Sequence, residues 1–84
     1  MKQYNFKKDY MKQYNIIWNT YSPETESGKR TLIESLVICT CSTLGNATII
    51  SNLLKENSIY GRTLAANNGS KTDSIMNEMI IQEA

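Results

Sequence analysis

Apolar positions along this chain recur mainly at three- and four-residue intervals, which is the spacing of one face of a helix. The densest such stretch carries these aliphatic residues: Leu32, Ile33, Leu36, Val37 and Leu44. Thr31 followed by Glu34 matches a capping box, and Gly45 stands where a left-handed residue would end a helix. The pattern therefore predicts a helix over 31–44.

Two shorter apolar stripes follow this stretch, and each is preceded by a residue that can cap a helix. Asn46 precedes the first stripe and Ser58 the second, which predicts helices near 47–56 and 59–67. Two short helices joined by about three residues, the second polar outside and apolar inside, are typical of a helix-turn-helix. The region 47–68 is therefore a candidate helix-turn-helix.

The N-terminal segment has aromatic residues at strict four-residue spacing: Phe6, Tyr10, Tyr14 and Trp18. This spacing predicts an aromatic-faced helix near 2–18, with lysines mainly elsewhere around it. Its aromatic face either closes the core or binds a partner or a nucleic-acid backbone. A strand at Tyr14–Trp18 is an alternative, because Tyr, Ile and Trp have high strand propensity.

The remaining segments complete an all-α prediction. Pro23 and Gly28 interrupt the pattern, so residues 21–30 are interpreted as a linker. A C-terminal helix is expected within 72–84, near 73–82, from the spacing of its apolar residues: Ile75, Met76, Met79 and Ile80. The sequence thus predicts one domain over 1–84, a small bundle of four or five helices comprising a segment at 1–20, central helices at 31–68 and the C-terminal helix.

Composition argues against an enzyme. The chain has no His, so a Ser-His or Cys-His nucleophile pair cannot form, and its acidic residues are scattered. Cys39 and Cys41 would point about 200° apart on a helix, so we expect them to be reduced and partly buried. Two cysteines without His do not make a zinc site, and we expect neither metal nor cofactor.

Charge and hydropathy limit the partners and the location. Nine Lys plus Arg face eight Asp plus Glu across the 84 residues, so any nucleic-acid binding must come from a local patch. The longest apolar run is four residues, Leu36 to Cys39, and no apolar signal segment opens the sequence. We expect a cytoplasmic protein without a membrane partner.

The first functional hypothesis is a small DNA-binding transcriptional regulator that uses the helix-turn-helix. In this hypothesis the second helix enters the major groove with four side chains: Tyr60, Arg62, Thr63 and Asn67. Lys55 and Lys71 would hold phosphates. So few cations imply weak monomer binding, which favours a homodimer through the C-terminal helix.

The alternative is a non-enzymatic protein-binding or inhibitory module that docks on a larger protein. Its contacts would be Trp18 in the aromatic N-terminal helix, or Met76 and Met79 in the C-terminal helix. Aromatic faces and flexible thioethers both suit a protein groove. The near-neutral charge favours this hypothesis.

Overall fold

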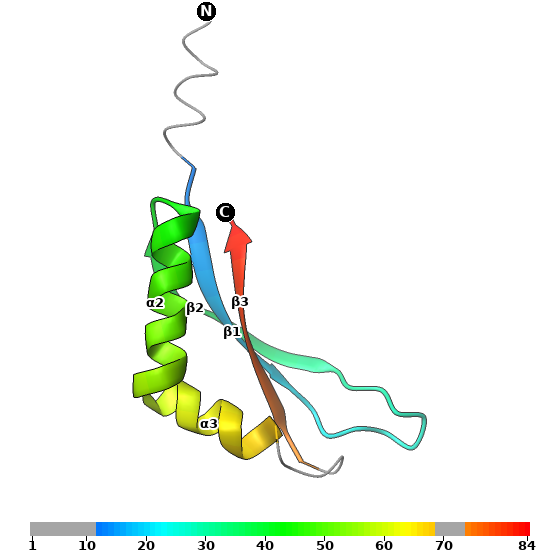
Figure 1. Cartoon of the computed structure of the whole chain (residues 1–84). Helices are drawn as coiled ribbons and strands as arrows, with labels where there is room; N and C mark the ends of the chain where they lie inside the picture. Colours follow the sequence, from blue (N-terminus) through cyan, green and yellow to red (C-terminus); the bar gives the residue numbers. More distant parts are fainter. Residues whose placement is uncertain (1–11, 69–73) are drawn as a thin grey trace, which may run out of the picture.

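A three-stranded antiparallel sheet is the centre of the protein, and two consecutive helices pack on one of its faces (Figure 1). The computed structural model describes residues 12–68 and 74–84. Along the chain the elements are β1 (Tyr14–Tyr21), β2 (Leu32–Cys41), α2 (Leu44–Asn57), α3 (Ile59–Asn68) and β3 (Met76–Glu83). The strand order is β2-β1-β3. The all-α prediction is therefore wrong, and the fold mixes helices with a sheet.

Strand β1 lies in the middle of the sheet and pairs antiparallel with both neighbours. The predicted helix near 2–18 is wrong over residues 14–18, where the strand alternative at Tyr14–Trp18 is confirmed. Four successive residues, Ile16 to Asn19, are buried, as expected for a central strand covered by neighbours on both sides. Phe6 and Tyr10 lie outside the described residues.

The predicted helix over 31–44 is strand β2, whose ten residues pair with β1. The segment is rich in β-branched residues, which favour strands because they restrict χ1 in a helix. The capping box at Thr31 and Glu34 does not form, and Gly45 lies inside α2 instead of ending a helix. The predicted C-terminal helix near 73–82 is likewise wrong, since Met76–Glu83 is the edge strand β3.

The two central helices are confirmed at nearly the predicted positions, as α2 and α3. Thr43 caps α2 in place of Asn46: its hydroxyl accepts a hydrogen bond from the Asn46 amide at 3.1 Å. A single residue, Ser58, separates the helices, and its hydroxyl accepts from the Tyr60 amide at 3.1 Å. Gly61 permits this tight corner, because a side chain there would overlap the Lys55 carbonyl.

The predicted linker at 21–30 is the connection between β1 and β2. Gly28 adopts a positive φ of 81° within its turn. Arg30 donates to the backbone carbonyls of Ser22 at 3.0 Å and Ser74 at 2.8 Å, and it lies 3.8 Å from the Glu24 carboxylate. These contacts tie the connection to the segment that leads into β3.

The core lies between the helices and one face of the sheet. Its buried members come from all three strands and α2: Ile16, Trp18, Cys41, Ala47 and Met79. Ser51 of α2 is also buried, and its hydroxyl lies 3.4 Å from the Met79 sulfur. Strand residues of alternate parity point to the opposite face, which no helix of the described residues covers.

Candidate interaction surface at the edge of the sheet

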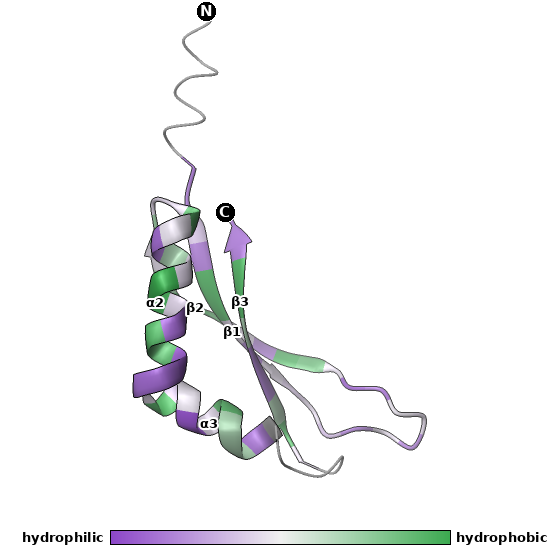
Figure 2. Cartoon of the chain, in the orientation of Figure 1, coloured by the Kyte–Doolittle hydropathy of each residue, from purple (hydrophilic) through white to green (hydrophobic). Residues whose placement is uncertain are grey.

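Strand β2 forms one edge of the sheet, and within residues 12–68 and 74–84 no strand pairs with its outer side. Four large aliphatic side chains on this strand are about half exposed: Leu32 49%, Ile33 57%, Leu36 47% and Val37 56%. Figure 2 shows hydrophobic residues on β2 well beyond the region that the helices cover. A long apolar edge strand with free backbone groups is a template for pairing with another chain.

β2 has few of the features that keep edge strands from pairing with other chains. The strand has one charged residue, Glu34, and contains neither Lys nor Pro. Two register irregularities interrupt its pairing with β1, next to Ile38 and Ile33, and leave a regular segment at 34–37. The opposite edge, β3, carries Glu78 and Glu83. Pairing with another strand is therefore favoured at β2.

Helix α2 adds a second apolar surface next to the same edge. At 100° per residue, Ile50, Leu53 and Ile49 form one stripe beside the buried face of Ala47 and Ser51, with Ile50 nearest to that face and Ile49 farthest from it. Ile49 and Ile50 line a cavity at the end of β2. Ile49 is 59% exposed and Leu53 is 52% exposed. We call Ile49, Ile50 and Leu53 the α2 flank.

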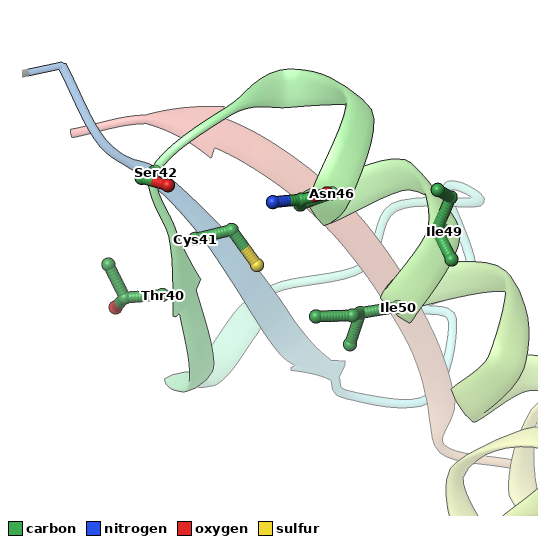
Figure 3. Close-up of a pocket in the computed structure, with 6 residues that line it drawn as sticks. All are labelled: Thr40, Cys41, Ser42, Asn46, Ile49 and Ile50. Atoms are coloured by element: carbon green, nitrogen blue, oxygen red, sulfur yellow. The ribbon is translucent and has the colours of Figure 1, made fainter. Parts of the chain in front are cut away.

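A cavity of about 310 Å³ separates the α2 flank from the end of β2. Figure 3 shows its lining residues: Thr40, Cys41, Ser42, Asn46, Ile49 and Ile50. The Cys41 sulfur and the Ile50 side chain point toward one another, and the Asn46 side chain points toward Ser42 and Cys41. Its volume and its aliphatic lining residues, Ile49 and Ile50, suit an aliphatic side chain.

On the face without helices, two polar pairs fix the position of β2 against β1. The Thr40 hydroxyl donates to Asn15 Oδ1 at 2.8 Å, and the Ser35 hydroxyl donates to Asn19 Oδ1 at 2.6 Å. Such cross-strand pairs specify register, because a slip by one residue would move each hydroxyl to the other face. These two pairs therefore fix the register of the edge strand against β1.

The two cysteines lie close together on β2, contrary to the prediction that they point apart. In a strand, residues two apart share a face, and Cys39 Sγ lies 3.9 Å from Cys41 Sγ. Both are free thiols, as expected, and Cys41 is buried. Burial raises the pKa of the Cys41 thiol, and the neighbouring Cys39 raises it further.

The residues of the DNA-binding hypothesis are dispersed. Tyr60 packs against Trp18 with ring centroids 5.0 Å apart, and the Asn67 amide donates to Asn77 Oδ1 on β3. Arg62 is exposed and Thr63 is half-buried. The predicted reading face is therefore directed partly into the sheet, and the helix-turn-helix prediction is wrong because both helices serve as the cover of a sheet.

The phosphate-contacting lysines do not restore that hypothesis. Lys55 is exposed and lines a cavity of about 370 Å³ that also includes Leu64, Met76, Asn77, Glu78 and Met79. The cavity thus pairs one cation with a carboxylate, which does not favour an anionic ligand. Lys71 lies outside the described residues. Nothing in the structure supports DNA binding or transcription regulation.

The residues of the protein-docking hypothesis lie mostly in the core. Trp18 is 9% exposed and Met79 is 7% exposed, while Met76 is half-buried on β3. None of them lies on a helix. Sequence reasoning missed the β2 edge and the α2 flank, although the β-branched content of 31–41 was a signal for a strand there.

No family model, curated protein or solved structure matches this chain. Among the described residues, neither helix is long and apolar enough to cross a bilayer. The same part of the chain contains no cluster of three or more His, Cys, Asp or Glu side chains that could hold a metal ion.

Proposed function

We propose that the chain is a non-enzymatic protein-binding module whose interface consists of the outer edge of β2 and the α2 flank. The observation that carries the proposal is the exposure of four aliphatic side chains within six residues of one edge strand. Strand addition at such an edge supplies backbone hydrogen bonds, and neighbouring pockets supply side-chain specificity. The cavity beside Cys41 and Ile50 is a pocket of this kind.

The exposed apolar side chains of β2 and the α2 flank are numerous enough to contribute substantially to binding. Six aliphatic side chains, four on β2 and two on the α2 flank, are each about half exposed. Full burial of one such side chain contributes about 1.5–3 kcal/mol. Since only the exposed half of each remains to be buried, covering all six contributes roughly 6 kcal/mol. Association itself costs at least ~4 kcal/mol, so a partner must add an apolar surface of its own.

The test is a capture experiment with the tagged chain in native lysate. Val37→Lys places a charge on the β2 edge without removing a core side chain, because Val37 is 56% exposed. Ile59→Lys is the matched control, since Ile59 is 63% exposed and lies on α3, which makes no contact with β2. We expect Val37→Lys to lose the captured protein and Ile59→Lys to retain it; equal capture by both variants would refute the proposal.

A further inference from the structure

We propose that the partner is a second copy of this chain, paired antiparallel through β2 about a two-fold axis to give a continuous six-stranded sheet. This inference rests on the proposed function, since it names what covers the β2 edge. In a two-fold dimer the same surface is used on both copies, so the surface must be complementary to itself. Three features of the β2 edge bear on this condition: its two ends, the position of its charged residue, and the neighbouring α2 flank.

The two ends of β2 are complementary to each other. One end exposes Leu32 and Ile33, and the other end, at Thr40 and Cys41, borders the cavity beneath the α2 flank. Antiparallel pairing of two β2 strands brings the first end of each copy alongside the second end of the other. Ile33 of one copy then lies alongside the end of its partner's β2 that borders the cavity, whereas Leu32, which is opposite Tyr21, lies on the face without helices. Symmetry makes each contact twice.

The register follows from the regular segment at 34–37 and from the pleat. Residues directly opposite each other in an antiparallel pair point to the same face. When the helices of both copies lie on one side of the sheet, a two-fold axis must therefore pass beside a residue that pairs with itself. Leu36 is opposite Trp18, on the helix side, and is 47% exposed because α2 and α3 do not reach it. Ser35 and Leu36 are the two central residues of the regular segment, and only Leu36 is apolar, so Leu36 is placed at the axis.

Charge and helix packing agree with this register. Glu34, the charged residue of β2, is then opposite Ile38 of the second copy, so the two carboxylates lie about 13 Å apart along the strands and repel weakly. The α2 flank borders the Thr40–Cys41 end of β2, so in the dimer it lies on the helix side of the incoming strand at that end and not at the axis. A lone strand would leave part of Ile49 and Leu53 exposed, whereas a second copy brings apolar groups to both layers.

The first experiment is sedimentation velocity of the full chain over a range of concentrations. We expect a species of twice the chain mass of 9.5 kDa. Leu36→Lys places two ammonium groups at the axis and should raise the dimer dissociation constant roughly a hundredfold or more. Ile59→Lys should leave it unchanged, and the urea midpoint of each variant confirms that it folds.

The second experiment fixes the register by disulfide trapping. In a chain with Cys39→Ala and Cys41→Ala, a single cysteine is introduced as Ser35→Cys, Leu36→Cys or Val37→Cys. Opposed residues of antiparallel strands lie about 4.5–5.5 Å apart at Cα, within the range for a disulfide. We expect oxidation to cross-link Leu36→Cys and to leave the other two as monomers on a denaturing gel.

The outcomes separate this inference from the proposed function. If the chain sediments as a monomer, and Val37→Lys abolishes its capture of another protein, the partner is not a second copy. The proposed binding module is then retained and the dimer is rejected. A dimer that Leu36→Lys does not weaken places the self-contact elsewhere and overturns the inference. A monomer whose capture is unaffected by Val37→Lys overturns both.

Discussion

The Trp18 indole and the Tyr60 ring meet edge to face, with centroids 5.0 Å apart and an angle of 64° between their planes. The contact joins the central strand β1 to the start of α3, which are far apart in the sequence. A T-shaped aromatic pair places the positive edge of one ring on the negative face of the other. Trp18 and Tyr60 therefore connect the helical layer to the sheet.

Trp18→Ala is expected to destabilise the fold by about 3–5 kcal/mol, because it removes a large buried side chain and leaves a cavity. The measurement is the urea midpoint at a constant m value. In a double-mutant cycle with Tyr60→Ala, we expect a coupling of about 0.5–1.5 kcal/mol. An unshifted midpoint for Trp18→Ala would show that the indole does not support the core.

Two glycines of the helices should respond in opposite directions to alanine. A Cβ at Gly61 overlaps the Lys55 carbonyl, so Gly61→Ala must move the backbone and should cost about 2–3 kcal/mol. A Cβ at Gly45 meets nothing within 4 Å, so Gly45→Ala should stabilise α2 by roughly 0.5 kcal/mol through lower unfolded-state entropy. Thermal unfolding of both variants beside wild type checks the pair, and destabilisation by Gly45→Ala would contradict the geometry.

The central helices could be predicted from the sequence because their apolar residues repeat only at helical spacing. In α2, Ala47, Ser51 and Leu54 form one narrow inner face, and the α2 flank lies beside it. The strands could not be separated from helices in the same way. Leu32, Ile33, Leu36 and Val37 satisfy helical spacing, yet in β2 they point to both faces of an edge.

The candidate interaction surface could not be predicted from the sequence for a related reason. A stripe of aliphatic residues is normally interpreted as core, so the sequence directed attention to Trp18 and Met79 as candidate contacts. The structure buries these two and exposes Leu36 and Val37. Strand order decides which residues are at the edge, and pairing between distant segments is not encoded in local periodicity. The β-branched content of 31–41 was the local signal that favoured a strand.

The thiols of Cys39 and Cys41 should react at different rates with iodoacetamide. Cys41 is buried and its pKa is raised, so less thiolate is present at a given pH, and the thiolate is the reactive form. We expect Cys39 to be alkylated first, and the reaction of Cys41 to require a pH above its usual range. Peptide mass mapping over time at several pH values checks the order, with urea-unfolded chain as the control, in which the two rates converge.

Tyr21 should lose its proton at a pH above the usual value near 10. Its hydroxyl donates to Glu78 Oε1 at 2.8 Å, and this hydrogen bond, together with partial burial and the carboxylate charge, raises the pKa of Tyr21. Because the folded pKa exceeds the unfolded pKa, the stability from this contact is complete below about pH 10 and is lost as the pH rises through the folded pKa.

Absorbance at 295 nm, taken as wild type minus Tyr21→Phe, isolates this titration. Glu78→Gln should move the midpoint back toward the usual value, because it removes the carboxylate that favours the protonated phenol. Glu83→Gln is the matched control, since Glu83 lies on the same strand and pairs with Lys12 at 4.0 Å instead. Unfolding free energy measured across pH 9–11.5 should fall more steeply for wild type than for Tyr21→Phe. Parallel curves would show that the phenol and the carboxylate do not interact in the folded protein.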